Sequence, residues 1–261
     1  MGTLDLAGKG FVHCVGQRLA DALFPSTCLA CRVRLGARPA PSLLCVACRG
    51  RFVPIDLRSS CDRCLRPLPP CPAGPTRCGA CLADSSGLAR LISVWRYQAP
   101  LSEAILALKF RRLDFLADAL AELALGREPF AACAPIDLIV PVPLAPLRRL
   151  GRGFNQAERI ARRLGLRLGL PVDDTLRRTD LLPSSQSRLG RAARRTTGTT
   201  RYRVRDRCEL SGRRILLVDD VVTTGSTLRS CAAALNAAGA EGVTGFSLAA
   251  TPARSWGIEP P

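Results

Sequence analysis

Short apolar runs and amphipathic stretches alternate along the last two thirds of the 261-residue chain. Each apolar run has the length of a strand buried on both faces, and each amphipathic stretch repeats its apolar residues at helical spacing. The expected strands cover 91–98, 136–144, 213–222 and 242–250, and the expected helices cover 100–110, 114–125, 154–166 and 226–240. This alternation predicts an α/β fold with a parallel sheet flanked by helices.

The N-terminal third has a different pattern from the rest. Together the patterns predict four parts of the chain. Phe11, Val15, Leu19 and Leu23 recur at helical spacing before Pro25, which predicts an amphipathic helix within residues 1–25. A cysteine-rich segment covers 26–84, the α/β domain covers 88–251, and a tail covers 252–261. The sequence has no run of 18 apolar residues and no signal-peptide layout, so we expect a cytoplasmic protein without a transmembrane segment.

Eight of the 13 cysteines form four Cys-x-x-Cys knuckles. Thirteen residues separate the first knuckle from the second and the third from the fourth, and the whole unit repeats at an offset of 33 residues. Two knuckles supply the four thiolates of a tetrahedral zinc site, so we expect two structural Zn²⁺ ions. The spacing leaves open whether the knuckles pair in sequence or interleave. The predicted ligands are Cys28, Cys31, Cys45, Cys48, Cys61, Cys64, Cys78 and Cys81.

Other uses of these cysteines fit the pattern less well. A reducing compartment disfavours disulfides, and a redox Cys-x-x-Cys normally occurs once, beside a βαβ unit. The cysteine-rich segment has few large apolar side chains and cannot build a core of its own, so bound metal is expected to supply its folding free energy. Docking to nucleic acid or to another protein is a second hypothesis for this segment.

Two adjacent acids and a hydroxyl-rich turn follow a buried strand in the stretch ILLVDDVVTTGSTL, at 215–228. One acid and one hydroxyl here would be ordinary turn and capping chemistry, but the stretch has more of both. At the carboxyl end of a parallel strand, N–H groups at a helix start hold phosphate, whereas carboxylates suit neutral hydroxyls. A Walker A loop is excluded because no Gly-Lys-Ser/Thr is present. The predicted ribose 5-phosphate site comprises Asp219, Asp220, Thr223, Thr224, Gly225, Ser226 and Thr227.

The chain carries a net charge of +17, from 36 Arg and 2 Lys against 21 acids. A basic surface of this size favours polyanions such as nucleic acid or phosphorylated metabolites. The charge is densest at 177–207, where ten Arg stand against two Asp without a sustained apolar period. A loop of this length is usually functional or disordered, and a plain solvated basic loop is the alternative.

Several motifs, taken in order, resemble the ComF family of competence-associated proteins. They are the knuckle block beginning FPSTCLAC, then RYQAPLSEAILALKF, IVPVPL, RGFNQAERIA and ILLVDDVVTTGSTL, and together they span about residues 20–250. The resemblance implies a double zinc ribbon followed by a type I phosphoribosyltransferase domain. It further implies phosphoribosyl pyrophosphate, or a nucleotide-like ligand, bound with Mg²⁺.

The resemblance also implies roles for particular residues. Asp219 and Asp220 would hold the ribose hydroxyls, and the turn at 223–227 would hold the 5-phosphate. Arg148 and Arg149 would belong to a pyrophosphate-binding loop. The basic stretch would be the flexible catalytic loop, with Gln186, Arg191, Arg194 and Arg195 acting on the leaving group. The family usually has Asn at position 197 and Gly at position 200, and this chain has Thr at both.

Two functions follow as hypotheses. The first is a phosphoribosyltransferase-like protein that binds phosphoribosyl pyrophosphate and takes part in DNA uptake. The second is a non-enzymatic competence factor that binds single-stranded DNA or docks DNA-uptake proteins. Single-strand binders interleave aromatic residues with basic ones, and in the Arg-rich stretch only Tyr202 meets that description. Nothing in the segment 88–125, the candidate hood over the ligand, predicts which base would be the acceptor.

Overall fold

The computed structural model describes residues 27–35, 43–69, 77–111, 113–127, 135–145, 153–179, 201–205 and 210–251. The predicted N-terminal helix therefore lies outside the described residues. The same holds for two groups with predicted roles. They are Arg148 and Arg149 of the expected pyrophosphate-binding loop, and Gln186, Arg191, Arg194 and Arg195 of the expected catalytic loop.

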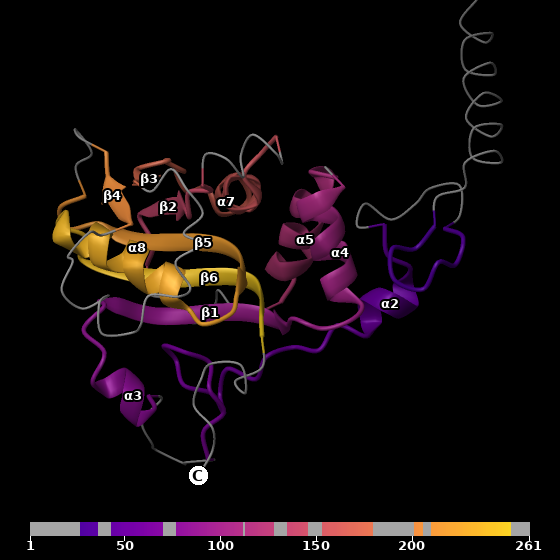
Figure 1. Cartoon of the computed structure of the whole chain (residues 1–261), viewed down its shortest axis with the longest axis horizontal. Helices are drawn as coiled ribbons and strands as arrows, with labels where there is room; N and C mark the ends of the chain where they lie inside the picture. Colours follow the sequence, from indigo (N-terminus) through magenta and orange to yellow (C-terminus); the bar gives the residue numbers. More distant parts are fainter. Residues whose placement is uncertain are drawn as a thin grey trace, which may run out of the picture.

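A parallel sheet of four strands forms the centre of the molecule, in the order β1-β6-β5-β2 (Figure 1). The strands are β1 (Leu88–Arg96), β2 (Leu138–Pro141), β5 (Arg214–Val222) and β6 (Gly242–Ala250). All three pairings are parallel, which confirms the predicted sheet. The strand expected over 136–144 is shorter than predicted and ends at Pro141. The four carboxyl ends lie along one edge, which we call the carboxyl edge.

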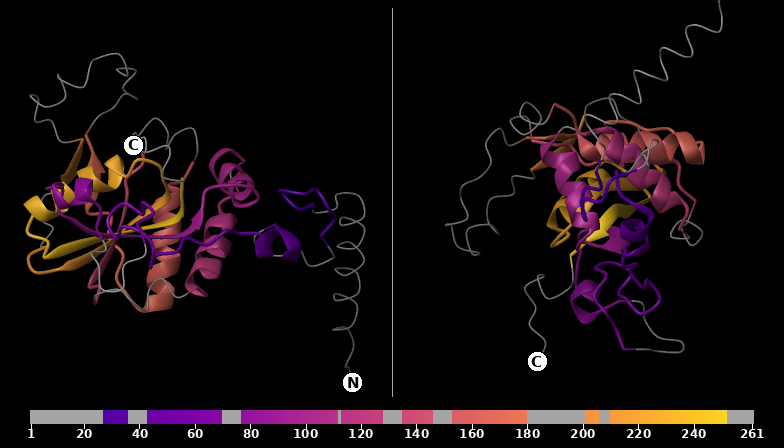
Figure 2. Two further views of the ribbon diagram at one scale, coloured as in Figure 1. Left: turned by 90° about the horizontal axis from the view of Figure 1, so that it is seen from below. Right: turned by 90° about the vertical axis from the view of Figure 1, so that its right-hand side faces the viewer.

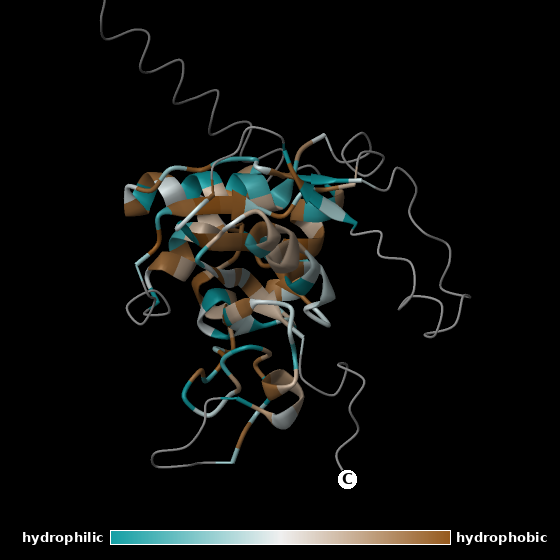
Figure 3. Ribbon diagram, turned by 90° about the vertical axis from the view of Figure 1, so that its left-hand side faces the viewer, coloured by the Kyte–Doolittle hydropathy of each residue, from teal (hydrophilic) through white to brown (hydrophobic). Residues whose placement is uncertain are grey.

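Helices cover both faces of this sheet and bury two apolar cores. On one face α4 (Leu101–Phe110), α5 (Phe115–Leu125) and α7 (Gln156–Leu168) pack around Ile92, Val218 and Phe246. On the other face α8 (Ser226–Ala237) packs against Leu91 and Leu217. Figure 3 shows the apolar residues gathered in the strands and along the flanking helices. Burial on both sides explains why the strands read as continuous apolar runs.

The start of α7 is fixed at the carboxyl edge. The Asn155 side chain accepts a hydrogen bond from the Ala157 N–H and donates one to the carbonyl oxygen of Val142, at the end of β2. The first contact caps the helix, and the second ties its first turn to the sheet. Further along, Gly165 allows α7 to approach the chain at 170–172 closely, since a Cβ there would lie 2.8 Å from the Leu170 carbonyl oxygen.

The ends of the Arg-rich segment form a small second sheet. β3 (Leu176–Arg178) pairs antiparallel with β4 (Tyr202–Val204), whereas the sequence predicted a loop over 177–207. Strands of three residues are too short to show an apolar period, which explains the difference. Tyr202 is only 5% exposed and packs into the core on the α8 face. The one aromatic of the Arg-rich stretch is therefore buried and is not available to stack on a base.

The middle of the cysteine-rich segment, at 53–55, runs along the free edge of β1, whereas residues 43–50 lie beyond α4 (Figure 2). The segment contains two short helices, α2 (Val46–Gly50) and α3 (Gly79–Leu82). Between them, Pro54 forms an antiparallel bridge with Trp95, and Ile55 donates its N–H to the Val94 carbonyl oxygen. The Phe52 and Trp95 rings meet edge to face, 5.3 Å between centroids. The segment thereby covers an edge strand that would otherwise be exposed.

Candidate functional site

Two groups of four cysteine sulfurs come together in the described residues. Within each group the sulfurs lie within 4.8 Å of one another. The first knuckle joins the second and the third joins the fourth, so the knuckles pair in sequence and do not interleave. The first cluster is Cys28, Cys31, Cys45 and Cys48, and the second is Cys61, Cys64, Cys78 and Cys81.

The sulfur geometry suits a tetrahedral metal rather than disulfides. Four sulfurs at about 2.3 Å from a Zn²⁺ ion lie about 3.8 Å apart. The Cys31–Cys45 and Cys64–Cys78 sulfur pairs are each 3.7 Å apart, far beyond the length of a disulfide bond. Backbone N–H groups also point at the sulfurs, as from Cys45 to the Cys28 Sγ at 3.4 Å. Burial raises the pKa of Cys28, but these hydrogen bonds outweigh it and lower the pKa to about 6.

The first cluster is part of a core of the α/β domain, whereas the second forms a small buried cluster of its own with Leu68. Cys28 and Cys48 of the first cluster are buried in the core of the α4 face, whereas Leu65, next to the second cluster, packs on the α8 face. Arg63 lies inside the third knuckle and is buried. Its guanidinium donates to the carbonyl oxygens of Leu88 at 2.5 Å and Cys81 at 2.6 Å, so the second cluster is clamped to the start of β1.

The acid pair stands near the carboxyl end of β5, in the middle of the carboxyl edge. Asp220 is buried and Asp219 is half-buried, and the Asp220 N–H donates to the Asp219 Oδ1 at 2.8 Å. Partial burial, together with the neighbouring Asp220 carboxylate, raises the pKa of Asp219 to about 7. Two adjacent carboxylates at such a position destabilise the folded state, because burial and mutual repulsion both disfavour their charges. Costs of this kind concentrate at functional sites.

Lys109, in the last turn of α4, contacts the acid pair directly. Its Nζ lies 3.1 Å from the Asp220 Oδ2. The two residues are 111 positions apart in the sequence, and no local pattern links them, so the sequence did not identify Lys109 as a site residue. The one available signal was that Lys109 is one of only two lysines in a chain with 36 Arg.

The hydroxyl-rich turn joins β5 to α8. Gly225 has a left-handed backbone (φ 68°) and is the residue before the helix, a conformation that glycine adopts without strain. The Thr224 and Ser226 hydroxyls are 2.9 Å apart and exposed. Arg229, one turn into α8, donates to the Thr224 carbonyl oxygen at 2.6 Å. The first N–H groups of α8 have no partner within the helix, which is the usual setting for a bound phosphate.

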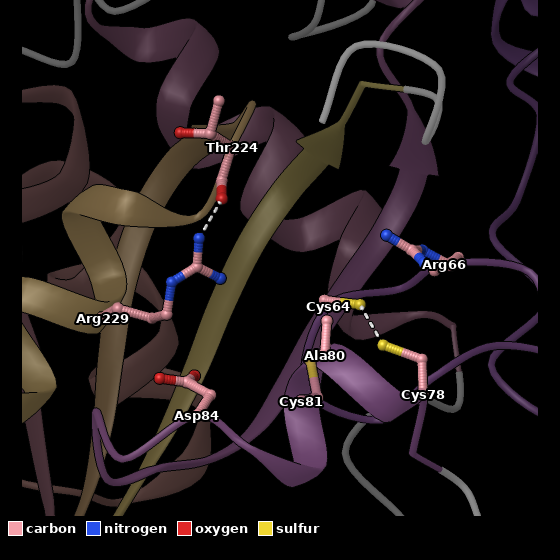
Figure 4. Close-up of a pocket in the computed structure, with 8 residues that line it drawn as sticks. All are labelled: Cys64, Arg66, Cys78, Ala80, Cys81, Asp84, Thr224 and Arg229. Atoms are coloured by element: carbon pink, nitrogen blue, oxygen red, sulfur yellow. Dashed lines mark hydrogen bonds between the residues drawn. The ribbon is translucent and has the colours of Figure 1, made fainter. Parts of the chain in front are cut away.

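A cavity of about 270 Å³ lies between this turn and the second cysteine cluster. Figure 4 shows Thr224 and Arg229 on one wall, and the sulfurs of Cys64 and Cys78 with Arg66 on the other. The turn is therefore open to solvent on the side of the second cluster.

None of the helices in the described ranges has the length and apolarity to cross a bilayer.

Comparison with known proteins identifies the family to which the chain is similar. The model of the phosphoribosyl transferase domain matches residues 145–255. The chain is 34% identical to the DNA utilization protein YhgH of Salmonella typhi over 225 residues, 80% of this chain and 97% of that one. It is 27% identical to Competence protein F of Haemophilus influenzae over 220 residues, 78% of this chain and 96% of that one.

Among solved structures, the chain is similar to the glutamine phosphoribosylpyrophosphate amidotransferase of B. subtilis. The identity is 19%, the TM-score is 0.35, and the match covers 53% of this chain and 26% of that one. Another similar structure is the protein TT1426 of Thermus thermophilus, with 18% identity, a TM-score of 0.31, and coverage of 56% and 85%.

The parallel sheet with its flanking helices and the matching domain model define a phosphoribosyltransferase-like protein that carries two four-cysteine clusters at its N-terminal side. Its relatives include DNA utilization and competence proteins aligned over nearly their whole length. The chain belongs to the ComF family, as the order of its motifs predicted.

Proposed function

We propose that the chain binds phosphoribosyl pyrophosphate, or a related ribose phosphate, at the carboxyl edge of its sheet, in a role linked to DNA uptake. One observation carries this proposal above the others. Asp219 and Asp220, the exposed turn with Gly225, and the start of α8 follow one another within a few residues at that edge. The names of the relatives support the link to DNA.

The two halves of the site suit two parts of one ligand. A carboxylate accepts hydrogen bonds and repels phosphate, so the acid pair suits the 2- and 3-hydroxyls of a ribose. The start of α8 offers N–H groups that have no partner within the helix and the positive end of a helix dipole, so it suits the 5-phosphate. The left-handed Gly225 brings the backbone close to the phosphate oxygens. The Thr224 and Ser226 hydroxyls would add donors.

Arg148 and Arg149 would bind the pyrophosphate, as the family motifs imply. We also assign the closing of the site to residues of the basic segment, namely Gln186, Arg191, Arg194 and Arg195. The three arginines would stabilise a leaving pyrophosphate, and the closed segment would exclude water. When bound with the ligand, Mg²⁺ would neutralise part of the pyrophosphate charge. These assignments rest on the family motifs. The proposal itself concerns ligand binding, which the acid pair and the turn support directly.

We further infer that each cysteine cluster holds one structural Zn²⁺. The four sulfur ligands, the sulfur spacing of 3.7 Å and the N–H groups directed at sulfur support this assignment. All eight ligand positions are supplied by the protein, so no position is left open for a substrate, as in structural zinc sites.

Isothermal titration calorimetry with phosphoribosyl pyrophosphate and Mg²⁺ tests the proposal. The wild type should bind, and Asp219→Ala/Asp220→Ala should lose most of the affinity. Glu241→Ala removes an exposed acid just before β6 begins, at the opposite edge of the sheet; it is the matched control and should bind like the wild type. Absence of binding by the wild type, or equal binding by the double variant, would refute the proposal.

Binding of single-stranded DNA is a second candidate, supported by the net charge of +17 and by the names of the relatives. If DNA binds through the basic segment, its affinity should fall steeply with salt, and replacing Arg194 and Arg195 should reduce that slope by about 1 to 2. Indifference of DNA affinity to both salt and these arginines would count against this candidate. Because Tyr202 is buried, its replacement should not weaken DNA binding by loss of stacking.

A further inference from the structure

The ion pair between Lys109 and Asp220 joins α4 to the carboxyl edge. The Nζ–Oδ2 distance is 3.1 Å, and the side chains are only 19% and 11% exposed. The helix that carries Lys109 is fixed by its buried residues Ile105 and Leu108. The ammonium group is therefore held at the acid pair by the core, and does not reach it from a mobile surface.

We propose that Lys109 is a positioning residue of the ribose phosphate site, which acts on the ligand through Asp220. This inference rests on the proposed function and adds to it a residue from a different part of the chain. In this role the ammonium group fixes the orientation of the Asp220 carboxylate and neutralises its charge. The carboxylate meanwhile accepts a hydrogen bond from a ribose hydroxyl.

The acceptor capacity of a carboxylate allows both contacts at once. Its two oxygens offer about four acceptor positions, and the Lys109 ammonium occupies one side of Oδ2. The remaining positions can take ribose hydroxyls. The ammonium therefore does not compete with the ribose for Asp220 and can stay in place when the ligand binds.

Charge gives the second part of the reasoning. The ligand is an anion, and two adjacent carboxylates repel it. Among the described residues, Lys109 is the only cation in an ion pair with either carboxylate. On the α8 side, burial and then the charge of Asp219 raise the pKa of the Cys231 thiol, and the charge of Arg178 in β3 lowers it. Of these groups, Lys109 is the one in direct contact with the acid pair.

The choice of lysine is itself informative. The chain uses Arg at 36 positions and Lys at only two, so a lysine at position 109 departs from its usual choice of cation. An ammonium is a compact point charge, whereas a guanidinium is a wide planar fork that would occupy both oxygens of the carboxylate. The smaller cation leaves part of Asp220 open to a ligand.

Calorimetry with Mg²⁺ and phosphoribosyl pyrophosphate, and separately with ribose 5-phosphate, tests this role. The variants are Lys109→Met, Lys109→Arg, Asp220→Asn and Lys109→Met/Asp220→Asn. Arg111→Met is the matched control, because Arg111 is an exposed cation at the end of the same helix. Thermal unfolding of each variant establishes that it is folded at the temperature of the titration.

We expect Lys109→Met to weaken binding of both ligands about 10-fold or more, because it leaves a buried carboxylate unpaired. Lys109→Arg should recover part of that loss, and Arg111→Met should bind like the wild type. The Lys109→Met/Asp220→Asn variant should bind no more weakly than Asp220→Asn alone, since Lys109 acts through Asp220.

Two results would overturn the inference while leaving the proposed function in place. One is wild-type affinity in folded Lys109→Met. The other is additive losses in the double variant, which would mean that Lys109 acts independently of Asp220. If the wild type binds neither ligand, the proposed function is refuted, and the role of Lys109 is refuted with it.

Discussion

Replacing Asp219 by Asn should make the protein more stable while it weakens ligand binding. Partial burial and the Asp220 carboxylate raise the pKa of Asp219 from 3.8 to about 7. The folded protein thus binds this proton more tightly than the unfolded chain does. Stability is therefore lost as the pH rises from about 4 to 7, and the loss is complete above about 7. Asn cannot ionise and keeps the Oδ1 that accepts the Asp220 N–H.

The magnitude follows from the difference between the two pKa values. A difference of about 3, at about 1.4 kcal/mol per pKa unit, sets an upper limit near 4 kcal/mol. Because Asp219 is only half-buried and ionises together with Asp220, we expect about 2 kcal/mol at pH 8. For a chain of this size that corresponds to a rise in Tm of about 4 to 8 °C.

Thermal unfolding followed by circular dichroism at pH 5, 6.5 and 8 checks this expectation. The gain in Tm of Asp219→Asn over the wild type should grow with pH. Asp173→Asn, at an exposed position, should show no such trend. A gain that is the same at every pH, or a lower Tm at pH 8, would show that ionised Asp219 does not strain the fold.

Three further predictions concern the fold, the metal and the turn. Gly165→Ala should lower the free energy of unfolding in urea by about 1–3 kcal/mol, since the added Cβ meets the Leu170 carbonyl. Gly242→Ala, where nothing lies within 4 Å, is its control, and equal effects would contradict the packing argument. Metal analysis should find two Zn²⁺ per chain, and Cys61→Ser should lose one of them; a wild type with one or none would exclude the paired clusters. Gly225→Ala should cost about 1–2 kcal/mol because of its positive φ and also weaken ligand binding in calorimetry, and unchanged stability would show that the turn accommodates a side chain.

The sequence was sufficient for the sheet because burial on both faces leaves a strong signal. β2 and β5 each contain a continuous apolar run, and α7 carries its apolar residues on one side. The cysteine ligands were equally accessible, because a repeat of four knuckles has few other meanings. Their pairing was not, since spacing alone cannot distinguish sequential from interleaved knuckles.

Contacts between distant segments were beyond sequence reasoning. The Lys109–Asp220 pair depends on how α4 packs on the sheet, and the bridge between Pro54 and Trp95 depends on how the chain returns along β1. The burial of Tyr202 was not predictable either, because a three-residue strand gives too few positions to show which face is buried. In each case tertiary packing determined the contact or the burial, and the local sequence pattern did not indicate it.

Hydrogen exchange of the backbone amides, with and without phosphoribosyl pyrophosphate and Mg²⁺, tests the central claim most directly. If the ligand sits at the carboxyl edge, exchange should slow at 219–227, where the acid pair leads into the turn and the start of α8. Residues 43–58 of the cysteine-rich segment, which do not line the cavity beside the turn, should be unaffected. Protection confined to the cysteine-rich segment, or no protection at 219–227 under saturating ligand, would contradict a ribose phosphate site at this edge.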